Sequence, residues 1–153
     1  MGFYYLETSA LVKLYVREPG TQRMIQLAAS PEGHTLAVLA LSRVELRAAV
    51  RRRQRAGDID SDVAAALIAR LEGHLQNLYL IQPLTEAVLE EASALLDRHS
   101  LRAYDAVQLA GCLALRARLV AELPWFVCSD QQLLVAAAEE GLAVMDPATE
   151  SAR

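Results

Sequence analysis

Several residue types are scarce in this sequence, and each shortage excludes a class of protein. Only two cysteines occur in the 153 residues, Cys112 and Cys128, and they lie in apolar surroundings without CxxC spacing. A disulfide framework or a cysteine-bound zinc site is therefore not expected, and buried thiols in a reducing cytosol are the simpler interpretation. The seven glycines are too dispersed for a G-x-G-x-x-G motif or a phosphate-binding loop.

Long apolar runs are also missing. The longest, "TLAVLAL" and "AVQLAGCLAL", are far shorter than the ~20 residues that cross a bilayer, and no basic-then-apolar leader opens the chain. We therefore expect a cytoplasmic protein without a membrane segment. With 54% hydrophobic residues, the composition suits a folded chain, expected as a single domain over residues 1–147 with a flexible tail over 148–153.

Positive charge is unevenly distributed along the chain. The net charge is −4, lysine occurs only as Lys13, and the arginines crowd into "SRVELRAAVRRRQR". The acidic total argues against a wholly basic nucleic-acid binder, whereas clustered arginine suits bidentate contacts with phosphate. A solvated helix face is an equally ordinary explanation of such a run.

The order of the apolar patterns predicts a three-layer α/β/α sandwich with a central, mainly parallel five-stranded sheet. Short β-type runs alternate with longer segments of helical period, as in a parallel sheet covered on both faces. We expect strands at 3–6, 35–39, 78–81, 125–128 and 142–145. We expect helices at 9–16, 21–29, 42–56, 60–76, 85–98, 103–119 and 131–140. No strand separates the third and fourth helices, so they should form a hairpin that stands off the sheet and offers a surface to a partner.

Four carboxylates occupy positions that local apolarity makes costly. They are Glu7 after "FYYL", Glu45 in "LALSRVELRAAV", Asp105 in "RAYDAVQLAGCLAL" and Asp130 after "WFVC". A lone buried carboxylate costs several kcal/mol, so each should be paired, hydrogen-bonded or metal-bound.

Each of these acids also has a purely local explanation. Ser42 and Glu45 match the S-x-x-E capping box, in which the glutamate reaches back to the cap. Asp105 falls in the first turn of its helix, where the helix dipole favours negative charge. Asp130 is a good N-cap, and Glu7 lies just before a threonine or serine cap.

Taken together, the four acids predict a shared site. All lie at or just inside helix N-termini, and a doubly wound parallel topology could carry them to one edge of the sheet. Converging carboxylates repel one another unless a cation neutralises them, and oxygen-only ligands favour Mg²⁺ or Mn²⁺ over zinc. The expected chemistry is phosphoryl transfer with a metal-activated water. The three histidines have no metal-ligand or triad spacing and offer no competing centre: His34, His74 and His99.

Four segments of the chain carry a family resemblance: "YYLETSALVKLYVREPGT", "LSRVEL", "LRAYDAVQLAGCLAL" and "FVCSDQQLLVAAAEEGLAVMDP". In this order, over nearly the whole chain, they resemble segments of PIN-domain proteins of the VapC toxin type. The resemblance implies an α/β/α sandwich that cleaves RNA with Mg²⁺ or Mn²⁺ held by acidic residues. It also implies inhibition by a cognate antitoxin and assembly as a homodimer.

The resemblance gives each acid a role. The family's four acidic positions fall on Glu7, Glu45, Asp105 and Asp130. The first and third would be the core metal ligands, and the other two would complete the site or orient water. Thr8 and Ser9 match the small hydroxyl residues that accompany the first acid, and we expect them to contact substrate.

Two positions depart from the family pattern. The family has aspartate where this chain has Glu7, and many members have threonine or serine where this chain has Cys128. Glutamate adds one methylene and moves the carboxylate by about 1 Å, which matters because Mg²⁺ demands near-ideal octahedral geometry. Glu7 could bind through another rotamer or a bridging water, could favour Mn²⁺, or could leave little activity.

The arginine-rich helix presents two stripes. At about 3.6 residues per turn, Glu45 shares its face with Arg52 and Arg53, which we expect to bind backbone phosphate. A separate stripe should face solvent or a partner: Arg43, Arg47 and Arg51.

The leading hypothesis is a metal-dependent endoribonuclease, the toxin of a toxin–antitoxin pair, which hydrolyses RNA phosphodiester bonds with a metal-activated water. The alternative is a catalytically weakened PIN-like module that binds RNA or protein, because the first acid is Glu7 rather than aspartate. A third hypothesis is a metal-dependent phosphatase or DNA nuclease on a similar fold.

Overall fold

Five parallel strands form the centre of the protein. The computed structural model describes residues 1–149. The strands are β1 (Phe3–Leu6), β2 (Thr35–Leu39), β3 (Leu80–Gln82), β4 (Trp125–Val127) and β5 (Ala143–Met145). They pair in the order β3-β2-β1-β4-β5, and every pair is parallel. The carboxyl ends of the strands therefore share one edge of the sheet, and β1 ends at the middle of that edge.

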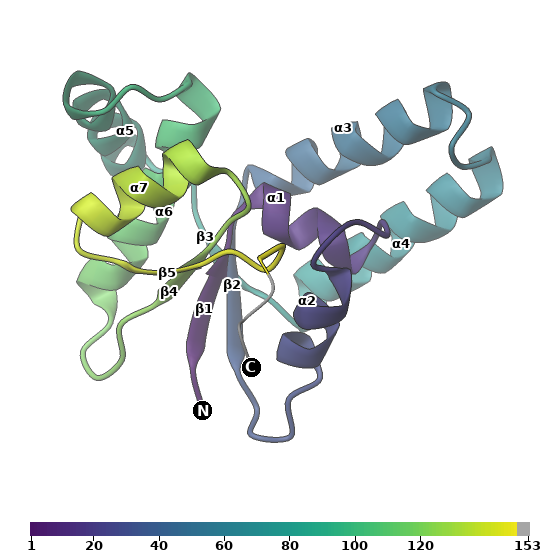
Figure 1. Cartoon of the computed structure of the whole chain (residues 1–153), viewed down its shortest axis with the longest axis horizontal. Helices are drawn as coiled ribbons and strands as arrows, with labels where there is room; N and C mark the ends of the chain where they lie inside the picture. Colours follow the sequence, from purple (N-terminus) through teal and green to yellow (C-terminus); the bar gives the residue numbers. More distant parts are fainter. Residues whose placement is uncertain (150–153) are drawn as a thin grey trace.

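Helices lie on both sides of this sheet and give three layers (Figure 1). On one side are α1 (Thr8–Leu11), the 3-10 helix η1 (Val12–Leu14), α2 (Thr21–Ala28), α3 (Ser42–Arg55) and α4 (Ser61–Asn77). On the other are α5 (Glu86–Arg98), α6 (Ala103–Arg118) and α7 (Gln131–Glu139). The expected α/β/α sandwich with a five-stranded parallel sheet is confirmed.

Alternation along β1 sends its side chains into two separate cores. Tyr5 belongs to the core under α5, α6 and α7, together with Phe126 and Leu109. The next residue, Leu6, belongs to the core on the opposite face, together with Leu11 of α1. Successive side chains of a strand point to opposite faces, so the short run "FYYL" contributes to both cores and fixes β1 between the layers.

A glycine lets α6 lie close against the sheet. A Cβ atom on Gly111 would lie 2.5 Å from the hydroxyl oxygen of Tyr5 and 2.8 Å from a methyl carbon of Leu39. A larger residue there would push α6 away from β1 and β2. The close approach allows the Tyr5 hydroxyl to donate to the backbone carbonyl oxygen of Gln108, at 2.9 Å.

The predicted boundaries lie within two residues of the observed ones, and the differences have local causes. The third strand, expected from residue 78, begins at Leu80 because the N–H groups of Leu78 and Tyr79 still donate to the carbonyl oxygen of His74 in α4. The first helix, expected over 9–16, is the short α1 followed by the tighter turn of η1.

The helices α3 and α4 form the predicted hairpin, which projects away from the sheet (Figure 1). Across the hairpin, the carboxylate of Glu72 lies 2.7 Å from the guanidinium of Arg43 and 3.9 Å from that of Arg47. Arg51 donates instead to Gln54 on its own helix. The separate arginine stripe therefore ties the two helices together as well as facing solvent.

The end of the described chain lies beside α2. Arg23 donates to the carbonyl oxygen of Thr149 at 3.1 Å, and the N–H of Ala148 donates to Asp146 at 2.9 Å. Of the tail expected over 148–153, these two residues are thus hydrogen-bonded, and 150–153 lie outside the described residues. Within residues 1–149, no helix combines the length and the apolarity needed to cross a membrane.

Two tyrosines and a histidine join the residue after η1 and the residue before β3 to α4. The Tyr15 hydroxyl lies 2.7 Å from Nδ1 of His74 and 2.6 Å from the Tyr79 hydroxyl. Partial burial lowers the pKa of His74, and the nearby charge of Arg70 lowers it further. The neutral imidazole is therefore the form that suits this contact.

We predict that His74 destabilises the protein in mild acid. The pKa of His74 in the folded state lies below the ordinary 6.5. As the pH falls below 6.5, the unfolded chain therefore binds more protons than the folded chain, and the free energy of unfolding decreases. His74→Asn keeps an acceptor for Tyr15 but cannot titrate. Thermal melts from about pH 7.5 to about pH 5.5 should show the wild-type Tm falling a few degrees more than that of His74→Asn. Parallel curves for the two proteins would contradict this prediction.

Candidate functional site

A pocket of about 690 Å³ lies beyond the carboxyl end of β1. Three predicted acids line it: Glu7 directly after the strand, Glu45 in the first turn of α3, and Asp105 in the first turn of α6. Arg52 and Arg53 of α3 line it as well. Groups from distant parts of the sequence and from both outer layers therefore face one space.

Glu7 is the cap of the first helix and is largely removed from water. Its side chain is only 6% exposed, and Oε2 accepts hydrogen bonds from the N–H and the hydroxyl of Ser9, the former at 2.9 Å. The local explanation placed the cap at a threonine or serine, and this is wrong because Glu7 itself is the N-cap. Burial raises the pKa of Glu7, while the hydrogen bonds from Ser9 oppose the rise.

The residues around Glu7 connect β1 to its neighbours. The hydroxyl of Ser9 accepts from the N–H of Ser129, in the loop after β4, at 2.8 Å. Thr8 lines the pocket. Cys128, the second departure from the family pattern, is buried beside Ser9, and its sulfur accepts from the N–H of Asp130 at 3.2 Å. Burial raises the pKa of the Cys128 thiol, which keeps it neutral and unsuited to binding a metal as thiolate.

Glu45 faces the pocket instead of capping its own helix. The N-cap of α3 is Leu41 and has no side-chain hydrogen bond, so the capping-box explanation of Ser42 and Glu45 is wrong. Oε1 of Glu45 accepts from Nε2 of Gln108 at 2.7 Å. Burial raises the pKa of Glu45, hydrogen bonds from Gln108 and Thr8 oppose this, and the charge of Asp105 raises it further.

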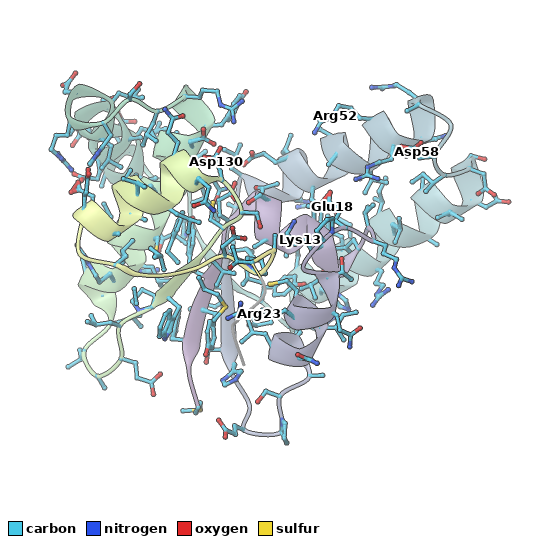
Figure 2. All side chains as sticks on the ribbon, viewed as in Figure 1. Lys13, Glu18, Arg23, Arg52, Asp58 and Asp130 are labelled. Carbon is cyan, nitrogen blue, oxygen red and sulfur yellow. The ribbon has the colours of Figure 1, made fainter. Side chains whose placement is uncertain are left out.

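The other two acids are linked through one arginine. Arg102, immediately before α6, donates from Nε to Asp105 at 3.1 Å, and its guanidinium lies 3.6 Å from the carboxylate of Asp130. Asp130 also accepts from the N–H of Leu133 at 3.1 Å, so its explanation as an N-cap is confirmed. Figure 2 shows Asp130 at the start of α7, across the sheet edge from Arg52 on α3. Asp130 is not one of the described residues that line the pocket.

The arginines of α3 differ in their pairing. A guanidinium nitrogen of Arg53 lies 3.0 Å from Glu18, whose other carboxylate oxygen lies 3.4 Å from the ammonium nitrogen of Lys13. Lys13 is the only lysine in the chain, is 5% exposed, and forms an ion pair with Glu18 through this contact. In Figure 2, Lys13 and Glu18 lie on the same side of the sheet as Arg52.

Sequence reasoning missed several side chains that shape the pocket, among them Arg102, Gln108 and Glu18. The first two had a usable signal, because they lie three residues before and three residues after Asp105 and so share its helical face. Glu18 had none, since "REPGT" reads as an ordinary surface turn and its contacts are made across the fold.

The acids offer the oxygen donors that a divalent cation prefers, but their side chains are not arranged as a set of metal ligands. Within residues 1–149, no three or more histidine, cysteine or acidic side chains are arranged to hold a metal ion. The pocket nevertheless offers carboxylate oxygens, the donors that Mg²⁺ and Mn²⁺ prefer. The charge of Glu45 raises the pKa of Glu7, as that of Asp105 does for Glu45, and a bound cation would relieve this repulsion.

Comparison with known proteins agrees with this architecture. The PIN domain model matches residues 4–122. The chain is 34% identical over 145 residues to Ribonuclease VapC47 of Mycobacterium tuberculosis (strain CDC 1551 / Oshkosh), covering 94% of this chain and 96% of the relative.

Solved structures share the fold at low sequence identity. FitAcB from Neisseria gonorrhoeae has a TM-score of 0.68 at 19% identity, over 94% of this chain and 97% of that one. A toxin-antitoxin complex from Klebsiella pneumoniae has a TM-score of 0.64 at 16% identity, over 94% and 97% of the two chains. The length of the family match and the identity to VapC47 decide the classification: this chain belongs to the PIN-domain family and is of the VapC type.

Proposed function

We propose that the protein is a metal-dependent endoribonuclease that serves as the toxin of a toxin–antitoxin pair. The observation that carries the proposal is the pocket at the carboxyl end of β1, whose lining includes five carboxylates, three of them the predicted acids, and three arginines. Membership of the VapC type supports an action on RNA, because the relative at 34% identity is named a ribonuclease.

Each side chain has a role in this proposal. Glu7, Glu45 and Asp105 would hold Mg²⁺ or Mn²⁺, with Asp130 completing the site or orienting water. The bound cation would supply Lewis-acid activation of water for attack on a phosphodiester. Arg52, which makes no ion pair among the described residues, would contact backbone phosphate.

Other residues would assist in binding the RNA strand. Arg53 shares its charge with Glu18 and would therefore bind phosphate more weakly than Arg52. Thr8 lines the pocket, and its hydroxyl would donate a hydrogen bond to substrate. The hydroxyl of Ser9 would do the same after giving up its hydrogen bond to Glu7. Binding through phosphate would make the affinity for RNA fall as salt rises.

The proposal includes a protein partner. Two of the structural neighbours are described as a toxin-antitoxin complex and as VapBC2 from Rickettsia felis bound to a promoter DNA fragment. We infer that this chain likewise has a cognate antitoxin, forms a homodimer and acts in the cytoplasm.

A second candidate function is a PIN-like module that binds RNA or protein without cutting. The position of Glu7 favours it, because that carboxylate is 6% exposed and one of its oxygens is occupied by Ser9. A side chain held in this way would have to exchange a hydrogen bond before it could bind a cation.

Loss of Asp105 should abolish both cleavage and cation binding. Purified protein should cut RNA with Mn²⁺ or Mg²⁺, and Asp105→Asn should lower the rate by about 100-fold or more. Millimolar Mn²⁺ should raise the Tm of the wild type, because a ligand that binds only the folded state stabilises it, and should leave Asp105→Asn unchanged. Asp97→Asn, at an exposed acid of α5, is the matched control and should behave as wild type. Equal cleavage by Asp105→Asn would place the activity elsewhere.

Shortening Glu7 distinguishes the two candidate functions. Glu7→Asp should raise the Mg²⁺-supported rate by about tenfold and the Mn²⁺-supported rate by less, because Mg²⁺ tolerates misplaced ligands poorly. Aspartate is also a good N-cap, so the first helix should be retained. If neither protein cuts RNA while both bind it in a gel-shift assay, the binding module is the correct function.

Neutralising Glu7 should stabilise the protein, and only at neutral pH. The pKa of Glu7 is raised in the folded state, so the folded chain binds more protons than the unfolded chain between the ordinary 4.5 and the raised value. The contribution of Glu7 to stability is therefore greatest in acid and is lost as the pH rises through the raised value. In metal-free buffer, Glu7→Gln should melt higher than wild type near pH 7, and the two melting temperatures should converge near about pH 4. A constant difference across this range would refute the charge-based explanation.

A further inference from the structure

Gln108 is the most heavily used buried polar side chain next to the pocket. It lies on α6, one turn after Asp105, and is 1% exposed. Its Nε2 lies 2.7 Å from Oε1 of Glu45, 3.0 Å from the Ser42 hydroxyl and 3.1 Å from the Thr8 hydroxyl. A single amide group therefore contacts α1 and α3 from α6.

The side-chain oxygen of Gln108 faces a residue of the sheet, Tyr5 of β1. The Tyr5 hydroxyl lies 2.9 Å from the backbone carbonyl oxygen of Gln108 and 3.3 Å from its side-chain Oε1. This contact exists because Gly111, one turn further on, lets α6 approach β1 closely. With its oxygen facing Tyr5, the amide must direct its nitrogen toward the pocket.

The amide nitrogen carries two hydrogens and has three acceptors within reach. Glu45 is the closest of the three and the only carboxylate, and a hydrogen bond to a charged acceptor is shorter and stronger than one to a neutral group. The hydroxyls of Ser42 and Thr8 can donate as well as accept, so they can share the second hydrogen. One of the two hydrogens therefore belongs to Glu45.

We propose that Gln108 is a positioning residue whose amide fixes the carboxylate of Glu45 in the pocket beside Asp105. The inference rests on the proposed function, in which Glu45 helps to hold the cation. Gln108 is buried and does not belong to the lining of the pocket. It acts through Glu45, as groups behind a metal ligand commonly do when they set the orientation of that ligand.

A second buried glutamine provides a matched control. Gln82 on β3 is also buried, and its amide nitrogen donates to the carbonyl oxygen of Pro83 while its oxygen accepts from Arg118. It contacts no carboxylate among the described residues and lies outside the pocket lining. Replacing either glutamine by methionine keeps the volume of the side chain and removes a buried amide together with its hydrogen bonds.

The test compares Gln108→Met with Gln82→Met and wild type by RNA cleavage and by Mn²⁺ titration calorimetry. Gln108→Met should lower kcat by about 10- to 100-fold and weaken Mn²⁺ binding by about tenfold, with the KM for RNA changed less than about twofold. Gln82→Met should also lose thermal stability while keeping the wild-type kcat and Mn²⁺ affinity. This difference separates positioning of Glu45 from a general loss of packing.

A second variant, Gln108→Asn, tests the same proposal if Gln108→Met does not fold. Gln108→Asn keeps a polar group in the same place, but cannot reach Glu45 without losing Tyr5, and should show the same direction of change. Wild-type kcat and Mn²⁺ affinity in either folded variant would overturn the inference. Wild-type protein that binds Mn²⁺ without cutting RNA would overturn the proposed function alone, since Mn²⁺ affinity would still test Gln108. A wild-type protein that neither cuts RNA nor binds Mn²⁺ would overturn the proposed function and the role of Gln108 together.

Discussion

Carboxylates withdrawn from water must be satisfied by hydrogen bonds or opposite charge, and this requirement organises the carboxyl edge of the sheet. The donors are Ser9 for Glu7, Gln108 for Glu45 and Arg102 for Asp105. All three donors also contact a further element: Ser9 accepts from Ser129, Gln108 reaches Thr8, and the guanidinium of Arg102 lies 3.6 Å from the carboxylate of Asp130. The groups that make the acids tolerable therefore also join the loops and helices around them.

The two apolar cores provide the stability that offsets the cost of burying the acids. Apolar side chains from alternate positions of β1 and β2 fill one core under α5–α7 and another under α1–α4. The acids oppose this stability, since burial and mutual repulsion raise the pKa of both Glu7 and Glu45. Such a conflict between local electrostatics and folding is typical of functional sites, where affinity for a charged ligand compensates for a less stable free protein.

The sequence carried enough information for the architecture and for part of the candidate site. Apolar periodicity located every strand and helix to within two residues, because buried faces impose a period that local residues reveal. Local capping rules were less dependable: "SRVEL" matches a capping box, yet Glu45 turns away from its own helix because Gln108 offers a donor across the fold. The pairing of Lys13 with Glu18 and Arg53 likewise depends on tertiary distances, for which no local pattern exists.

The pocket draws its acids from both sides of the sheet: Glu7 and Glu45 come with the α1–α4 layer, and Asp105 comes with α6 in the opposite layer. Neither layer contains all three acids, so the pocket forms only when the two layers lie in the correct position relative to each other. A slide of α6 by one residue would separate Asp105 from Glu45 while leaving every helix intact, and the close contact of Gly111 with the sheet opposes such a slide. Alignment of the layers, rather than the presence of secondary structure, is therefore the property that folding must deliver before the pocket exists.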